Sequence, residues 1–398
     1  MEQLGWLIFL VALLFSVMLH ESGHFMTAKK FGMKATQFFV GFGPTVWSFR
    51  RGETEYGVKA FPVGGFVKII GMTSMDEVDP EDEPRSFRRQ PGWQRLIVLA
   101  AGSFMHFLLA AVMIFVLALT IGVGTANTPP KFVTIASCVP ASTAAMDNGT
   151  CTASDPKSPA ALAGLRSGDL VTSYDGKKMT SFSQLSSALE HTKPGTTVPI
   201  TVLRDGKTLT LHVTPASVKG RPGGYLGVSG ESFALQRTGV PGAVSYVGSA
   251  FSQEIVGSVQ GLGHIPSEIP KLFSKSSGSS GGSGVTSTVG VAEVTGQAVA
   301  ANTSLANKIS FIVLIIASVN IFVGVFNLVP LLPLDGGHIA VVIWERIRAR
   351  IARLRRRPDP GLVDYTKLIP VSLSVFAVLV VFGVALMISN VINPVSLG

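Results

Sequence analysis

The run His20-Glu21-Ser22-Gly23-His24 holds the side chains of this sequence best suited to chemistry. In an α-helix, positions 20 and 24 lie one turn apart on the same face, so their imidazoles can converge on one Zn²⁺. Glu21 lies beside them, where its carboxylate can accept a proton from a metal-activated water. The pattern therefore predicts a zinc site that activates water.

This run follows an apolar stretch, because residues 4–19 carry no charged side chain. A chance match would leave three ionisable side chains at or near bilayer depth, where such groups are costly unless they serve a site. The position of the run in the chain therefore favours the metal site over a chance match.

A second unusual run, residues 327–338, ends the third apolar stretch and contains Pro330, Pro333 and Asp335. The prolines interrupt the backbone hydrogen bonding of a helix, and a carboxylate at such a break near membrane depth indicates a metal, ion or substrate site. Zn²⁺ held by two histidines needs one more protein ligand and one open position for water. Asp335 is the best candidate for that third ligand.

The composition indicates a membrane protein, since 47% of the 398 residues are hydrophobic and only 14% are charged. Four apolar stretches approach the length of about 20 residues that spans a bilayer. They are residues 4–25, 96–123, 309–332 and 368–391. The first is not expected to be a cleaved signal, because Glu2 precedes it and no Lys or Arg does.

The net charge of +9 is concentrated in two loops between these stretches. Residues 26–95 hold 11 Lys and Arg, and residues 340–367 hold 8. The positive-inside rule places both loops in the cytoplasm, so both termini and residues 124–308 are expected outside. The basic charge implies no nucleic acid partner, because arginines beside a spanning helix more often bind anionic lipid headgroups.

Between the first two spans, residues 41–71 alternate short β-type runs with Gly and Pro turns, which predicts two hairpins. The region is too apolar for a free loop and too broken for a spanning helix. Backbone of this kind is tolerated at membrane depth only against protein or a wet cavity.

Residues 130–228 read as a small β-rich domain. Asp175-Gly176 and Asp205-Gly206 indicate two hairpins, and residues 181–191 read as a helix. The order of elements, and above all the run from Ala163 to Asp169, resembles a PDZ domain, which captures peptides by adding a strand to a sheet edge. A peptide or protein partner is therefore expected for this domain.

Cys138 and Cys151 both fall in the segment expected outside the cytoplasm. A disulfide is the favoured interpretation there. Two unpaired thiols remain an alternative, and a metal pair is disfavoured because neither cysteine has a Cys or His at ligand spacing. Further along, residues 242–273 predict one or two amphipathic helices, and the Ser/Gly-rich residues 274–284 predict a flexible linker.

The chain resembles the site-2 protease family of intramembrane zinc metalloproteases, in its bacterial branch with a single PDZ domain. The resemblance rests on three features: H-E-x-x-H in the first span, a central PDZ-like domain, and N-x-x-P-x-x-P-x-D-G-G at the end of the third span. The resemblance implies zinc ligands at His20, His24 and Asp335 and a catalytic base at Glu21. It also implies that Asn327 binds the substrate backbone or the oxyanion.

The resemblance further implies that the hairpin region helps to hold an unwound substrate segment, with Gly64 and Gly65 among the substrate-binding residues. One position departs from the family pattern. The second span of that branch usually shows a G-P-x-x-N type run, whereas this chain has Gly102 followed by His106. His106 is open to four interpretations: a substrate contact, a second-sphere donor, an extra ligand, or a histidine hydrogen-bonded between helices.

The sequence thus predicts an α-helical membrane protein with four transmembrane helices, a membrane-associated β-hairpin region and an inserted extracytoplasmic PDZ-like α/β domain. The expected parts are residues 1–129, the N-terminal membrane half; 130–228, the PDZ-like domain; 229–307, the helical segment and linker; and 308–398, the C-terminal membrane half.

The expected activity is hydrolysis of a peptide bond within the membrane segment of single-span proteins, with membrane-bound anti-sigma factors as the substrate class that the resemblance implies. Zn²⁺ is the expected cofactor, and the multi-pass chain is expected in the cell membrane. Two rival functions remain: an inactive membrane-anchored PDZ scaffold, which would not need Glu21, and an ion-coupled transporter, which four spans without an internal repeat disfavour.

Overall fold

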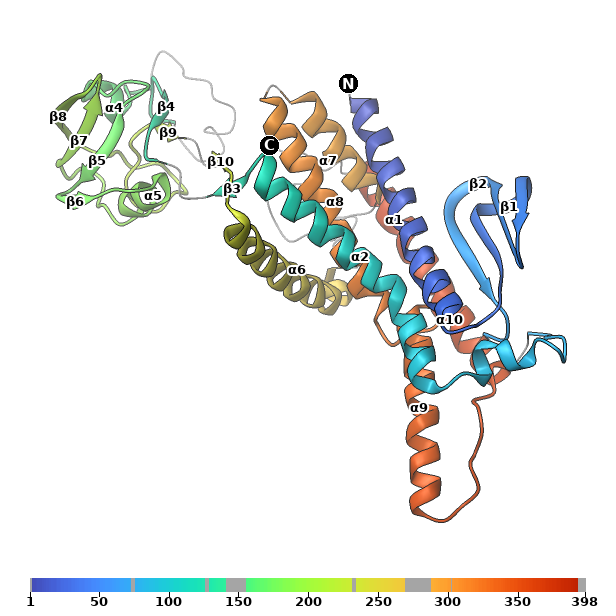
Figure 1. The fold of residues 1–398 in the computed structure, drawn as a ribbon. Helices are drawn as coiled ribbons and strands as arrows, with labels where there is room; N and C mark the ends of the chain where they lie inside the picture. Colours follow the sequence, from blue (N-terminus) through green and yellow to red (C-terminus); the bar gives the residue numbers. More distant parts are fainter. Residues whose placement is uncertain are drawn as a thin grey trace. The chain divides into compact units, whose positions relative to one another are not determined.

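The computed structural model describes residues 2–72, 76–125, 129–140, 155–230, 234–268, 288–301 and 303–392. The chain divides into two units, Met1–Thr120 with Thr238–Gly398 and, inserted between them, Ile121–Arg237. Unit 1 carries the long helices, and the described part of unit 2 carries short strands and the short helices α4 and α5 (Figure 1). The predicted linker at 274–284 lies outside the described residues.

Among the residues that the structure describes, four helices of unit 1 are long and apolar enough to cross a membrane, which confirms the four predicted spans. They are α1 (Glu2–Lys30), α2 (Gly92–Thr120), α8 (Leu305–Asn327) and α10 (Ile369–Ile392), the last preceded by the short η4 (Tyr365–Leu368). α2 is the central helix of the four, because both α1 and α8 pack along it.

Three further helices pack on these spans. α6 (Val240–Glu268) lies along α2 and α8, α7 (Thr288–Ala300) packs mainly on α1, and α9 (Asp335–Leu354) packs on α2. The helix predicted from residue 242 onward is a single helix, α6, over its described length. α9 fills much of a segment that the sequence predicted only as a basic cytoplasmic loop.

The region after α1 forms one long bent hairpin, so the prediction of two hairpins was wrong. β1 (Ala35–Arg51) pairs with β2 (Thr54–Ile69) from base to tip. The strands bend where Gly41, Gly43 and Gly64 adopt φ values of 84°, 90° and 100°, a region that side chains disfavour. These glycines bend the strands and do not end them.

Because of this bend, residues 37–40 of β1 pair on both sides, with residues 65–68 and with residues 55–58 of β2. The hairpin therefore folds into a small sheet in which residues 65–69 form one edge. This edge faces α1, since a Cβ on Gly65 would lie 2.6 Å from the Met18 sulfur.

The base of the hairpin, the end of α1, the start of α2 and α9 share one buried apolar cluster. The cluster also receives Phe87 from the short 3₁₀ helix η2 (Phe87–Arg89), which follows η1 (Glu83–Arg85). Nearby, Lys29 and Arg85 bind the Glu53 carboxylate in the hairpin turn, and the bonds from Arg85 and then Lys29 lower the pKa of Glu53 to about 2.

Unit 2 contains a four-stranded sheet in the order β6-β5-β7-β8. The strands are β5 (Leu170–Tyr174), β6 (Lys177–Lys178), β7 (Val198–Arg204) and β8 (Lys207–Val213). Both predicted hairpins are confirmed: Asp175 and Asp205 have positive φ and are each followed by a positive-φ glycine, as the tight turns between paired strands require.

Two helices cover the apolar core of this sheet, α4 (Pro159–Leu162) and α5 (Phe182–Glu190), the second of which the sequence predicted. Two shorter strand pairs form separate two-stranded sheets in the described part of unit 2. They are β3 (Val123–Thr125) with β10 (Ala234–Gln236), and β4 (Phe132–Ile135) with β9 (Val228–Gly230). Cys138 is buried in unit 2, whereas Cys151 lies outside the described residues, so their disulfide remains a prediction.

Asp169 ties the start of the sheet to its neighbouring strand. Its carboxylate is almost fully buried and accepts two bonds of 2.7 Å from the Arg204 guanidinium and one of 2.9 Å from the Arg166 amide. Burial alone would raise the pKa of Asp169, but the bonds from Arg204 and Arg166 lower it below its ordinary value.

We predict that Asp169→Asn lowers the free energy of unfolding of unit 2 by about 2 kcal/mol, because it removes charge-assisted bonds from a buried site. Since the pKa of Asp169 is lowered in the folded state, its stabilisation is present above the unfolded pKa and is lost as the pH falls below about 4. Hydrogen exchange of unit 2 amides in the full chain measures both effects. Asp175→Asn, in an exposed turn, is the matched control, and equal exchange in the two variants would contradict the prediction.

Candidate metal centre

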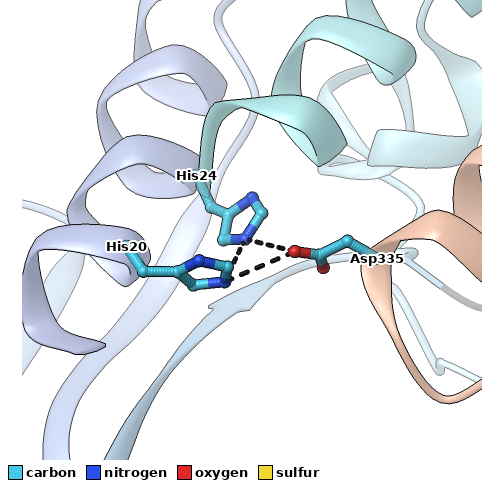
Figure 2. Close-up of side chains that lie close together, drawn as sticks. All are labelled: His20, His24 and Asp335. Carbon is cyan, nitrogen blue, oxygen red and sulfur yellow. Dashed lines mark hydrogen bonds and ion pairs between the residues drawn. The ribbon is translucent and has the colours of Figure 1, made fainter. Parts of the chain in front are cut away.

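His20 and His24 lie on one face of α1, and Asp335 is the first residue of α9 (Figure 2). The Nε2 atoms of His20 and His24 are 3.1 Å apart, and they lie 3.3 Å and 3.4 Å from Oδ2 of Asp335. Among the described residues, these are the one group of three whose ligand atoms lie close enough to share a metal ion.

The three donor atoms fit Zn²⁺ in chemistry and in spacing. Tetrahedral zinc with bonds of about 2.1 Å places its ligand atoms about 3.4 Å apart, close to the three distances in this site. The Oδ2 atom of Asp335 is buried and has no hydrogen-bond partner within the described part of the chain, although the Nε2 atoms of both imidazoles lie 3.3 Å and 3.4 Å from it. A bound cation would satisfy this oxygen.

Glycines allow the helices to approach this closely. A Cβ on Gly102 of α2 would lie 2.4 Å from His24 Nε2 and 2.5 Å from His20 Cε1, and a Cβ on Gly23 of α1 would lie 2.5 Å from the Ala101 carbonyl oxygen. The two imidazoles therefore pack directly against the backbone of α2.

The α2 backbone also orients one of the imidazoles. Nδ1 of His24 lies 2.7 Å from the Val98 carbonyl oxygen, which can only accept, so Nδ1 carries a proton and donates it. Nε2 is then left with its lone pair directed at the other two donor atoms. This is the tautomer that a metal ligand needs.

Asp335 is placed by the break that follows α8. Residues 328–334 form turns between α8 and α9, and a Cβ on Gly336 or Gly337 would lie 2.3 Å and 2.5 Å from the backbone of this segment. The two glycines therefore let the first turn of α9 fold tightly onto the break, and the carboxylate sits at a helix N-terminus, where negative charge is favoured.

A buried ion pair fixes α9 on α2. Nη1 of Arg95 lies 2.8 Å from Oε2 of Glu345, with both side chains less than 8% exposed, and Oε1 of Glu345 accepts from the Val363 amide. The pair connects the helix that carries Asp335 to the helix against which the two histidines pack.

Glu21 points from α1 toward the hairpin. Its Oε2 accepts a hydrogen bond of 3.1 Å from the backbone amide of Val67, on the edge of the small sheet. The carboxylate is thus held by the β element beside the two histidines.

A model of peptidase family M50 matches residues 8–358. Zinc metalloprotease Rip1 of Mycobacterium bovis is 35% identical over 99% of this chain and 98% of the relative, and the Rip1 protein of Mycolicibacterium smegmatis is 34% identical over 100% and 99%. Regulator of sigma-W protease RasP of Bacillus subtilis is 27% identical over 84% of this chain and 88% of the relative.

The chain belongs to peptidase family M50, the site-2 proteases. It is therefore a zinc metalloprotease, and Zn²⁺ is its cofactor, as the sequence predicted. The membership favours the protease over the scaffold and transporter alternatives.

The other residues that the sequence predicted for the site of this M50 peptidase lie outside the group of three metal-binding candidates. His106 of α2 is buried beside His20, with ring centroids 5.0 Å apart, and Gly64 and Gly65 lie at the bend and on the edge strand of the hairpin. Asn327 is the last residue of α8 and is half-buried, and among the described residues it makes no hydrogen bond to the metal centre. The roles of these residues remain predictions.

Sequence reasoning missed the groups that orient the site: the Val98 carbonyl, the Val67 amide and the bare Cα of Gly102. Every residue has a backbone donor or acceptor, so no residue type marked the first two. Gly102 did carry a signal, because it matches the glycine of the G-P-x-x-N run of the resembled family, but the sequence did not show that it lies against the two imidazoles.

We predict that Gly102→Ala lowers zinc affinity at least tenfold, because the added methyl group would overlap both imidazoles and displace them from the metal. Zinc content and chelator competition on the purified protein measure the effect. Gly383→Ala on α10 is the matched control, since nothing lies within 4 Å of the added methyl group there. Equal affinity in the two variants would show that the rings do not need this close approach.

Proposed function

We propose that this M50 peptidase cleaves single-span membrane proteins within their membrane segments, with His20, His24 and Asp335 as its zinc ligands and Glu21 as its catalytic base. The observation that carries the proposal is the convergence of the three donor atoms within 3.4 Å of one another, between helices long enough to span a bilayer. Three protein ligands leave a tetrahedral ion one position for water, as in catalytic zinc sites.

When bound, Zn²⁺ supplies a Lewis acid that makes water a nucleophile near neutral pH. Glu21 then accepts the proton of the attacking water and returns it to the leaving amine of the cleaved peptide. Its place next to His20 and its separate bond to Val67 support a role as base and not as ligand. Asn327 would donate its amide protons to the peptide oxygen as negative charge develops.

We predict that Glu21→Gln lowers the cleavage rate at least a hundredfold while zinc remains stoichiometric, because glutamine keeps the shape but cannot accept the proton. Single-span membrane proteins that accumulate in cells carrying this variant identify the substrates, and their cleavage is then measured with purified enzyme. Wild-type rates in the variant would remove Glu21 from the mechanism. Absence of zinc from the wild-type protein would instead contradict the proposed site.

The Val67 amide is well placed to orient the base. Backbone amides alternate in direction along a strand. The Ile70 amide, three residues after Val67, donates to the Lys34 carbonyl oxygen next to the start of β1. The Val67 amide therefore points the other way, away from β1 and toward Glu21 on α1. The carboxylate of Glu21 is thus fixed by a donor that does not belong to the metal centre.

Val67→Pro removes this donor without removing a hydrogen bond between the strands, because proline is tolerated at an edge whose amide points away from its neighbour. We predict a fall in kcat of about tenfold with unchanged zinc content, from the loss of one hydrogen bond to a charged group. Val67→Ala, which shortens the side chain but keeps the amide, is the control. Equal kcat values for the proline and alanine variants would exclude the orienting role.

The hairpin edge is also the proposed docking strand for substrate. A helical substrate hides its carbonyl groups in its own hydrogen bonds and must unwind before attack, and an exposed strand edge can pair with the unwound segment. Gly64 and Gly65 would let the substrate backbone come close. The relative named for regulation of sigma-W supports anti-sigma factors as the substrate class.

We further propose that unit 2 is a PDZ-like domain outside the cytoplasm. Its four-stranded sheet with two covering helices supports a PDZ-like fold. The basic stretches 26–95 and 340–367 meet at one end of the helices in unit 1, as the shared apolar cluster indicates, and α2 runs from that end to Thr120, where unit 2 begins. The positive-inside rule then supports a cytoplasmic basic end and an outer unit 2.

A single added cysteine at the exposed Lys207 should react with a membrane-impermeant thiol reagent in intact cells, and one at Arg355 only after permeabilisation. Mass spectrometry of the labelled protein measures both, with the chain lacking added cysteines as background control. The reverse pattern would place unit 2 in the cytoplasm.

A further inference from the structure

One buried donor at the metal centre has no acceptor. If Nε2 of His20 faces the zinc ion, its Nδ1 carries the ring proton. This Nδ1 is buried and has no hydrogen-bond partner among the described residues, whereas Nδ1 of His24 has the Val98 carbonyl. Metal-bound histidines almost always donate this second N–H, and the donation fixes the orientation of the ring.

The Nδ1 edge of His20 faces α2. A Cβ on Gly102 would lie 2.7 Å from this nitrogen. His106 is one helical turn further along α2 on the same face, and side chains of a helix tilt toward its N-terminus, which here means toward Gly102. The ring centroids of His20 and His106 are 5.0 Å apart, so His106 is a polar side chain of α2 that lies close to the unpaired donor.

Asn320 of α8 decides which nitrogen of His106 is free to accept. The amide nitrogen of Asn320 donates to the Ile316 carbonyl oxygen at 2.8 Å, so the other amide atom, facing His106 at 2.8 Å, is the oxygen. An oxygen cannot donate here, so Nδ1 of His106 carries the proton and Nε2 is left with a lone pair. His106 and Asn320 are both only 2% exposed, which shields this arrangement from water.

We propose that His106 is a positioning residue for the metal ligand His20: its Nε2 accepts the His20 Nδ1 proton, directly or through one water, and Asn320 holds His106 in the tautomer that can accept. The inference rests on the proposed zinc site. It differs from a role as a fourth ligand, because the nitrogens of His106 lie outside the group of donor atoms that His20, His24 and Asp335 form.

The test is zinc affinity, measured by chelator competition on the purified full-length chain. His106→Phe keeps the ring volume and removes the acceptor, and we expect its Kd for zinc to rise 10- to 100-fold. Asn320→Leu should also raise the Kd for zinc. The Kd of the double variant should not exceed that of His106→Phe alone, because the two residues act as one unit. His106→Gln restores an acceptor near the Nε2 position and should recover part of the affinity.

Ser310→Ala, a buried change on α8 away from the site, is the matched control for packing between the helices. Unchanged zinc affinity in folded His106→Phe would reduce His106 to a packing residue and overturn the proposal. If that variant does not fold, unchanged zinc affinity in folded Asn320→Leu would overturn the proposal instead. Complete loss of zinc from folded His106→Phe would indicate that His106 is itself a zinc ligand, which would also contradict the proposed role as a positioning residue.

His20→Ala separates this inference from the proposed function. If that variant binds zinc as tightly as the wild type, the zinc site itself is wrongly assigned. If it loses zinc while His106→Phe keeps wild-type affinity, only the positioning role fails.

Discussion

The metal centre depends on a close contact between three helices. Two donor atoms come from α1 and the third from the start of α9, more than 300 residues later in the chain, yet they must stay within 3.4 Å of one another. α2 makes this possible because it contacts both. It receives the imidazoles against Gly102, and it holds α9 through the buried pair of Arg95 and Glu345. A shift of about 1 Å at either contact would move the three donor atoms out of bonding distance of a single ion.

The same helix also sets the chemistry of the ligands. The Val98 carbonyl fixes the tautomer of His24, and in our proposal His106 does so for His20, so that α2 would direct both lone pairs toward a bound ion. Glu21, the proposed base, is held by the hairpin instead, through the amide of Val67 on its edge strand. Because that edge is also the proposed docking strand, a paired substrate would lie next to the group that activates the water.

Much of this arrangement could be predicted from the sequence. Ionisable residues in long apolar stretches are costly, so His20, Glu21, His24 and Asp335 stood out against their surroundings, and the structure brings the three metal-binding candidates together. The Asp-Gly turns of unit 2 were predicted because only a few residue types tolerate positive φ.

Other features depend on contacts between distant segments, and local patterns do not encode these. The bent hairpin was predicted as two, because glycines that curve a strand resemble glycines that end one. The roles of Gly102, Val98 and Val67 became visible only when α2 and β2 lay beside α1. Likewise, the acceptor nitrogen of His106 follows from Asn320, 214 residues away.

X-ray absorption spectroscopy at the zinc edge of the purified wild-type protein would identify the atoms that bind the metal. We expect a first coordination shell of nitrogen and oxygen atoms at about 2.0–2.2 Å, with scattering from two imidazole rings. Replacing Asp335 with Ala should change the light-atom shell or remove the metal, and should leave no site with the wild-type spectrum. A sulfur ligand, three or more imidazoles, or a wild-type spectrum after loss of Asp335 would contradict the assignment of His20, His24 and Asp335 as the zinc ligands.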